Sequence, residues 1–288
     1  MTLPARAADR EEVAAATVAG GAWGPGPLSQ TAGRVLPPLL VGVGALAAWE
    51  LLVRTKEIPP YILPGPLLII RTLVTDWHTL FPSLVVTVTI TAAALTAATV
   101  AGVLIAILFA QSKWIELSFF PYAVILQVTP VVAIAPLIII WVKNIPISLL
   151  ICAWIVAFFP IVSNTTLGLN STDHNLLSLF ELYGASRRQV FWYLRLPSAL
   201  PYFLGGLRIS GGLALIGAIV AEFVAGTGGI QSGLAYRILE SGYTLQIPRM
   251  FAALLLVTGT GISIFLALTA VTHLALRRWH ESAVRREA

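Results

Sequence analysis

The chain has 288 residues, of which 57% are hydrophobic and only 11% charged, and its mean hydropathy is +0.86. A soluble domain usually carries about 25% charged residues, so this composition excludes an ordinary soluble fold and indicates one integral membrane domain. The formal charge of +5 is also typical of nucleic-acid binding, but in so apolar a chain it predicts cations that flank membrane spans.

Residues 1–34 hold much of the polarity outside the apolar runs and are rich in Ala, Gly and Pro. Such a segment buries little apolar surface, so we expect a flexible cytoplasmic tail. The apolar stretch begins only after Arg34 and shows no clear cleavage site, which favours a first membrane span over a secretory signal. The one cysteine, Cys152, lies inside an apolar run, so no disulfide can form within the chain.

A helix needs about 20 mostly apolar residues to cross the hydrocarbon of a bilayer. Four uncharged runs meet this need, and two weaker runs contain Glu50 in one case and Arg208 and Glu222 in the other, with Arg208 near a span end. The runs do not alternate as barrel strands do, so we predict an all-α bundle of six spans. The expected spans are about 35–53, 83–110, 118–142, 146–166, 203–224 and 251–275, in a transmembrane domain 35–276 followed by a basic cytoplasmic tail 277–288.

The placement of lysine and arginine predicts the orientation, because cytoplasmic segments carry an excess of both. The terminal segments and the even-numbered connectors hold eleven of them, namely Arg6, Arg10, Arg34, Lys113, Arg187, Arg188, Arg195, Arg277, Arg278, Arg285 and Arg286. The other face holds six, namely Arg54, Lys56, Arg71, Lys143, Arg237 and Arg249. We therefore expect both termini, and the connector between the fourth and fifth spans, in the cytoplasm.

Two connectors and one span carry further signals. Residues 54–82 place apolar side chains at helical spacing around Arg71 and Asp76, which predicts a helix along the membrane interface. Residues 225–250 combine a glycine cluster with a short amphipathic segment that ends at Glu240. Prolines kink membrane helices at cavities, at hinges or simply at packing sites. The third span has three: Pro121, Pro130 and Pro136.

The connector at 171–200 has capping signals for two short helices. Residues 171–173 (Ser-Thr-Asp) offer N-caps ahead of an amphipathic stretch. Gly184 suits the turn that ends a first helix, because glycine tolerates a positive φ. Ser186 and Gln189 form a capping box that begins a second helix at once. The sequence therefore predicts helix, glycine turn, helix.

The second helix of this connector is expected to close at Pro197 and Pro201, before the fifth span. The connector exposes two arginines, Arg187 and Arg188, and has two interpretations. One is an interfacial helix with arginines that snorkel to the lipid surface, and the other is a docking element for a cytoplasmic partner.

The pattern of Gly184, nine residues, then Leu194-Arg195-Leu196-Pro197 resembles the EAA loop of type I ABC-importer permeases: EAA, three residues, Gly, nine residues, I-x-L-P. The EAA positions read Ser178-Leu179-Phe180 here, without the glutamate. PYAVILQVTPVVAIAPLIIIW, FFPIVSNTTLGL and LPSALPYFLGGLRISGGLALIGAIVAEFVAGTGG are similar to the third, fourth and fifth spans of that family. The resemblance covers 79–280 and is nearest to the nitrate/sulfonate/taurine-type permeases, with their pyrimidine-precursor and riboflavin relatives.

This resemblance implies a six-helix permease bundle with cytoplasmic coupling helices, in the bacterial plasma (inner) membrane. It implies a homodimer that receives a small organic solute from an extracytoplasmic binding protein and is driven by two separate ATP-binding subunits, which hold ATP and Mg. No lysine of the chain follows a glycine, so a Walker A phosphate loop is absent, and we expect no enzyme activity in this chain. Carried over by position, the ATPase-coupling residues are Leu182, Tyr183, Gly184, Ala185, Ser186, Arg187, Leu196 and Pro197.

Other residues are candidates for the translocation path. Glu222 ends the fifth span, where we expect its carboxylate to reach interfacial water and either to gate the path or to make a structural pair. Gln127, Thr129 and Pro130 either line the path or make helix–helix hydrogen bonds. Five glycines predict close helix packing or dimer contact, at positions 205, 206, 211, 212 and 217.

The sequence shows no metal or catalytic site. Its four histidines lack metal-ligand spacing, and its carboxylates form no intramembrane acid/base pair. A self-sufficient secondary transporter is the alternative function, but it is expected to show internal repeats and coupling carboxylates. A membrane-embedded enzyme would need a cluster of catalytic residues.

Overall fold

A computed structural model describes residues 27–226 and 232–277, with side chains from residue 36 onward. All regular structure in these residues is helical. The chain divides into two compact units, Met1–Glu57 and Ile58–Ala288. Of the two expected tails, residues 1–26 and 278–288 lie outside the described part.

The first unit contains α2 (Pro27–Thr55), so the last residues of the expected flexible tail are already helical. Its segment Leu36–Thr55 is long and apolar enough to cross a membrane, and it covers the expected first span. The side chain of Glu50, which interrupts the apolar run, accepts a hydrogen bond from Arg54 Nε at 2.7 Å one turn later. The two charges therefore compensate each other within the helix.

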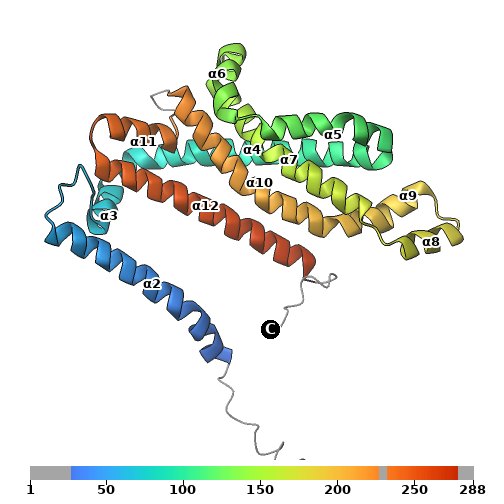
Figure 1. The fold of residues 1–288 in the computed structure, drawn as a ribbon, viewed down its shortest axis with the longest axis horizontal. Coiled ribbons are helices and arrows are strands. Elements are labelled where there is room, and N and C mark those ends of the chain that lie inside the picture. Colours follow the sequence, from blue (N-terminus) through green and yellow to red (C-terminus); the bar gives the residue numbers. More distant parts are fainter. Residues whose placement is uncertain (1–26, 227–231, 278–288) are drawn as a thin grey trace, which may run out of the picture. The chain divides into compact units, whose positions relative to one another are not determined.

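The second unit is a bundle of long helices with short helices at both ends (Figure 1). Its elements are α3 (Pro66–Thr75), α4 (Trp77–Gln111), α5 (Lys113–Val128), α6 (Val131–Val142), α7 (Ile145–Asn170), α8 (His174–Leu182), α9 (Arg187–Val190), a π-helical turn η1 (Phe191–Arg195), α10 (Leu196–Ala225), α11 (Leu234–Tyr243) and α12 (Ile247–Leu276). With α2, the described part has five helices that could span a membrane, or six if the bent pair α5–α6 is one span.

The core of this unit lies where α7 packs along α4 and α10, and small residues make the close approach possible. Ala94, Ala153 and Ala218 are fully buried in one cluster. A Cβ added at Gly217 would lie 2.8 Å from Ala153 Cα, and one at Gly206 would lie 2.7 Å from a backbone oxygen of α7. Without a hydrophobic driving force between helices in lipid, such close van der Waals contact is what holds membrane helices together.

The five glycines predicted to pack closely fall into two groups on α10. Gly206 and Gly217 face α7, and a Cβ at Gly211 would clash with the side chain of Leu268 on α12. Gly205 and Gly212 have nothing within 4 Å of an added Cβ. Close packing within the chain therefore explains three of the five.

The expected third span is two helices, α5 and α6, bent by 98°. Thr129 and Pro130 between them have extended backbones, with ψ of 122° and 112°. The residue before a proline is driven out of the helical region, and the proline itself has no N–H for the helix, so the break falls at this pair. Pro121 and Pro136 lie inside α5 and α6, which continue through them.

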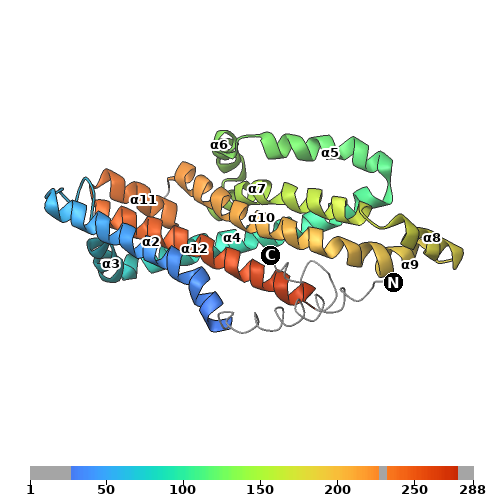
Figure 2. The ribbon, with the colours of Figure 1, turned by 60° about the horizontal axis from the view of Figure 1, so that its bottom comes forward.

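At one end of the unit, α3 and α11 lie beside the starts of α4 and α12 (Figures 1 and 2). The predicted helix in 54–82 is α3, and α4 begins at Trp77, earlier than the expected span start at 83. An ion pair joins this end: Arg249 Nε on α12 lies 2.5 Å from Asp76 Oδ2 at the junction of α3 and α4. The amphipathic segment predicted in 225–250 is α11, although residues 227–231 of its glycine cluster lie outside the described part.

At the other end, α8 and α9 form a helical hairpin between α7 and α10 (Figures 1 and 2). The prediction that the second hairpin helix closes at Pro197 and Pro201 is wrong, because Arg187–Ala225 is one continuous helical stretch. The π-helical turn η1 precedes Pro197, which occupies the first turn of α10, where a missing N–H costs little. Pro201 lies inside α10.

Candidate functional site

The hairpin at 174–190 is built by local hydrogen bonds that its sequence predicts. Asp173 caps α8 by accepting a hydrogen bond from Asn175 N at 2.8 Å. At the other end of α8, Gly184 N donates to Glu181 O and Ala185 N donates to Phe180 O, both at 2.9 Å. This pair of bonds is a Schellman motif, and it needs the left-handed backbone that Gly184 adopts with φ of 68°.

The second helix of the hairpin starts directly after this turn. Ser186 Oγ accepts from Gln189 N at 3.3 Å, and Gln189 Oε1 accepts from Ser186 N at 2.7 Å. The predicted capping box is therefore present in full. Gly184 and this box together leave two residues between the C-terminal cap of α8 and the N-terminal cap of α9, so the tip of the hairpin is tight.

The predicted coupling residues lie together at this tip. Leu182 is 85% exposed and Tyr183 is 84% exposed, although both are large and hydrophobic. Ser186 and Arg187 are also exposed, Ala185 is partly buried, and Gly184 has open space around it. Leu196 and Pro197 are partly buried at the start of α10, where they join the hairpin to the bundle. An exposed apolar tip rimmed by polar residues is the pattern of a protein-binding surface.

Behind the tip, a cavity of about 780 Å³ separates the hairpin from the end of α4. Three arginines line it together with Trp192 and Glu181, namely Arg187, Arg188 and Arg195. Arg195 Nη1 donates to Ala110 O in the last turn of α4 at 3.4 Å. The turn η1, which follows the hairpin, is thus attached to the end of α4.

Glu222 lies in a buried polar cluster at the opposite end of the bundle, where it is 3% exposed. Its carboxylate accepts from Thr87 Oγ1 on α4 at 2.8 Å and from Ala235 N in the first turn of α11 at 3.0 Å. Thr87 Oγ1 in turn accepts from Leu234 N at 2.9 Å. A Cβ on Gly233 would clash with the carboxylate, so the backbone of α11 approaches it as closely as glycine allows.

The Glu222 cluster therefore joins α4, α10 and the N-terminus of α11. The expectation that this carboxylate reaches interfacial water is wrong, because backbone and hydroxyl donors enclose it. Of the two roles predicted for Glu222, this geometry fits structural pairing. The donors at a helix N-terminus also favour a carboxylate there, because the helix dipole is positive at that end.

The other predicted path residues lie at the α5–α6 break. Gln127 and Pro130 are exposed, and Thr129 Oγ1 donates back to Ile125 O at 2.6 Å within its own helix. The hydroxyl of Thr129 is therefore already paired, whereas Gln127 presents its amide outside the described fold. None of these three residues is a hydrogen-bond partner of Glu222, although α6, which begins directly after Pro130, packs against α10.

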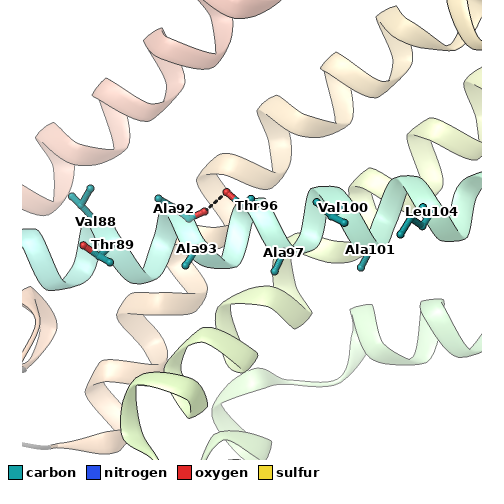
Figure 3. Close-up of a pocket in the computed structure, with 9 residues that line it drawn as sticks. All are labelled: Val88, Thr89, Ala92, Ala93, Thr96, Ala97, Val100, Ala101 and Leu104. Carbon is teal, nitrogen blue, oxygen red and sulfur yellow. Dashed lines mark hydrogen bonds between the residues drawn. The ribbon is translucent and has the colours of Figure 1, made fainter.

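A shallow hollow of about 1,010 Å³ runs along one face of α4 (Figure 3). Its lining is apolar apart from two threonines, and Thr96 Oγ1 is paired with Ala92 O at 2.8 Å. The side chains that form it repeat every three or four residues: Val88, Thr89, Ala92, Ala93, Thr96, Ala97, Val100, Ala101 and Leu104. This small-residue face is shaped to pack against another helix.

The described residues hold no group of three His, Cys, Asp or Glu side chains that could bind a metal ion. The second unit has an exposed hairpin at one end, the buried Glu222 cluster at the other and long packed helices between them. It provides surfaces for binding and for movement.

Comparison with known proteins identifies the family. The sequence pattern of the binding-protein-dependent transport system inner membrane component matches residues 98–279. The chain belongs to this family. It is a permease component of an ABC importer and a multi-pass protein of the inner membrane, as the EAA-like spacing predicted. Membership disfavours the alternative of a self-sufficient secondary transporter.

Relatives of this permease cover nearly the same length. It is 33% identical to the formylaminopyrimidine transport permease protein ThiX of Halalkalibacterium halodurans, over 84% of this chain and 96% of the relative. It is 27% identical to the taurine transport system permease protein TauC of Escherichia coli, over 82% of this chain and 86% of the relative. A crystal structure of an amino acid ABC transporter with histidines has the same fold, with a TM-score of 0.58 at 18% identity, over 72% of this chain and 97% of that one.

Sequence reasoning missed the partners of the permease's polar residues. Thr87 lies 135 residues from its partner Glu222. Arg237 Nε donates to Ser83 Oγ at 3.0 Å, and these two residues are 154 positions apart. Hydroxyl residues inside an apolar run usually bond to their own helix, as Thr91 does with Thr87 O. Only the charge of Glu222 in an apolar helix signalled that a partner was needed.

Proposed function

We propose that the hairpin tip at Leu182–Arg187 is the docking site for a separate ATP-binding subunit, and that ATP-driven movement of this subunit is transmitted through the hairpin to the bundle. The observation that carries the proposal is the exposure of Leu182 and Tyr183 on a tip fixed by two helix caps. A rigid apolar protrusion can transmit force to the helices that follow it, whereas a flexible loop cannot. ATP and Mg are bound by the partner, and hydrolysis takes place there.

The connection to the moving helices supports this role. Arg187–Ala225 is one continuous helical stretch, so a displacement at Arg187 reaches the buried part of α10 without passing a loop. Leu194 on η1 is buried, and Arg195 attaches the same turn to the end of α4. Leu196 and Pro197 are part of this continuous helix and transmit the displacement from the hairpin to the bundle.

We also propose that the hairpin and both termini lie in the cytoplasm, in accordance with the excess of eleven cations over six. Lys113, Arg187, Arg188 and Arg195 lie at the hairpin end of the bundle, and Lys143, Arg237 and Arg249 lie toward the other. Arg277 lies at the end of α12, and five further terminal cations lie outside the described residues: Arg6, Arg10, Arg278, Arg285 and Arg286. The end with α3 and α11 then faces the binding protein.

The permease acts as a homodimer in this proposal, and the solute path lies between the two copies. The small-residue face of α4 supports this, because no described residue of the second unit fills its hollow (Figure 3). An extracytoplasmic binding protein delivers the solute in this proposal, and the solute is a small organic molecule, as it is for the formylaminopyrimidine and taurine transport relatives. Gln127, Thr129 and Pro130 lie at the α5–α6 break, where an exposed amide could meet that solute.

A matched pair of substitutions tests the docking site. Tyr183 and Tyr243 are 84% and 85% exposed, but they lie at opposite ends of the unit. Leu182 and Leu245 form a second such pair, at 85% and 70%. We expect Tyr183→Ala and Leu182→Ala to weaken association with the ATPase subunit at least tenfold in nanodiscs, because large apolar residues dominate interface energies. Tyr243→Ala and Leu245→Ala should leave it unchanged. Equal effects at both ends would refute the proposal.

A further inference from the structure

Arg208 is a charged side chain well inside a spanning helix, which its position in the sequence did not show. Ser210, two residues further along α10, donates from Oγ to Ala157 O at 2.7 Å. Ala157 lies 12 residues from Ile145 and 13 from Asn170, the two ends of α7. At about 1.5 Å per residue, Arg208 is therefore within roughly 5 Å of the middle of α7. The expectation that it sits near a span end is wrong.

At this height the guanidinium cannot easily reach the lipid headgroups. The half-thickness of the hydrocarbon is about 15 Å, so the interface lies about 10 Å or more from Arg208, which is farther than its side chain extends. The guanidinium carbon lies 5.9 Å from the ring centroid of Phe265 on α12, 18 residues from Ile247 and 11 from Leu276. This contact also holds it at the middle part of the bundle.

Arg208 has no counter-ion among the described residues of the second unit. The four ion pairs found in 27–226 and 232–277 involve other arginines and one lysine. Its side chain is exposed, and within the second unit its guanidinium lies over the ring of Phe265. A cation at membrane depth is costly unless it meets water or an anion, so something outside these residues must solvate it.

The side of α10 that carries Arg208 is open. Gly205 and Gly212 lie three residues before and four residues after it, on the same helix face, and nothing lies within 4 Å of an added Cβ at either. Gly206 and Gly217, by contrast, are packed against α7. The open face is therefore a distinct surface of α10, and Arg208 lies at its border with α12, at a level between the two glycines.

We infer that this open face of α10 lines the solute path and that Arg208 binds the negative group of an anionic solute, such as a carboxylate or a sulfonate. The inference rests on the proposed function, in which the path lies between two copies of the permease. A water-filled path removes the cost of an unpaired cation at this depth. A guanidinium is also suited to an anion of this kind, because its planar fork donates two parallel hydrogen bonds to the oxygens.

The reactivity of introduced cysteines tests both whether water reaches the open face of α10 and whether the charge of Arg208 acts there. Cys152 is the only cysteine of the chain, so Cys152→Ala provides a background free of thiols. Gly212→Cys is then added, with Gly205→Cys as a second probe position, and the complex with its ATPase subunit is placed in nanodiscs. The probes are the anionic 2-sulfonatoethyl and the cationic 2-(trimethylammonium)ethyl methanethiosulfonates, each measured relative to a free thiol in solution.

We expect both probe positions to react and to favour the anionic reagent by about tenfold, because a unit charge within about 10 Å acts at a low effective dielectric constant. Arg208→Gln should abolish this preference, and Arg208→Lys should retain it. Reaction with neither reagent, or a preference that survives Arg208→Gln, would overturn the inference. Copurification of the ATPase subunit is recorded for every variant. If the parent chain fails to retain that subunit the proposed function fails, whereas retention without charge preference removes only the role of Arg208.

Discussion

Replacement of Gly184 distinguishes the effect of the backbone conformation of the hairpin turn on docking from the effect of its surface side chains. Gly184 has φ of 68°, and nothing lies within 4 Å of the Cβ that a side chain would add. A substitution there meets no steric clash, so its effect comes from the backbone conformation alone. Gly184→Val forces a β-branched residue into the left-handed region, whereas Gly184→Asn places there one of the few side chains that tolerate it.

The cost of the valine can be worked out from the turn. A left-handed backbone costs about 1–2 kcal/mol for an ordinary residue and more for a β-branched one. If the turn relaxes instead, the two Schellman hydrogen bonds at 2.9 Å are lost, at about 0.5–1.5 kcal/mol each. Either way the native tip is disfavoured by about 2–3 kcal/mol, which corresponds to roughly a 30- to 150-fold loss of the docking-competent form.

The assay is the affinity of the nanodisc-embedded permease for its ATPase subunit. We expect a loss of that size for Gly184→Val and a loss of less than about fivefold for Gly184→Asn, because Asn tolerates the left-handed region. Membrane insertion should be unaffected, since α8 and α9 have no buried residues and contribute little to the core. If the valine variant binds the ATPase subunit as tightly as the asparagine variant, docking does not depend on the left-handed turn and the reasoning fails.

Three further predictions concern the stability of the bundle, measured by thermal unfolding in detergent. Glu222→Ala leaves the donors of Thr87 and Ala235 unpaired in a buried site and should cost about 2–4 kcal/mol, whereas Glu222→Gln keeps one acceptor and should cost less; equal losses would contradict the hydrogen-bond geometry. Gly217→Val should destabilise strongly because Ala153 lies in the way, while Gly212→Ala should be neutral or slightly stabilising, and a reversed order would show that the packed face is misassigned. Reversal of the Asp76–Arg249 pair in the double variant should recover at least half of the stability lost by either single reversal, and strictly additive losses would mean that the pair contributes nothing.

Local sequence signals predicted the hairpin well, because each of its turns is decided within a few residues. Asp173, Gly184 and the Ser186–Gln189 box satisfy backbone groups no more than five positions away, so their residue types are sufficient to place the caps. The same holds for the break at Pro130, although a 98° bend in place of a kink was not foreseen. Propensity failed at Pro197, where a π-helical turn lets the helix continue.

The pairing of distant residues could not be derived in this way. Nothing in the sequence distinguishes Gly206, packed on α7, from Gly205 beside it, which faces open space, since only the rotation of α10 against its neighbours decides between them. Arg208 appeared to lie near a membrane surface because span ends were estimated from hydropathy. The hydrogen bond between Ser210 and Ala157 shows instead that Arg208 lies level with the middle of α7.

The sequence by itself therefore determined the class of the protein, the approximate position of its long apolar helices, and the hairpin that resembles a coupling element, because hydropathy and helix capping act over short stretches of chain. Tertiary structure alone decided that Glu222 is enclosed by Thr87 and the start of α11, and that Arg208 is exposed on α10 at the level of the middle of α7. Those facts depend on how rigid helices rotate and slide against one another, and small residues far apart in the chain set both.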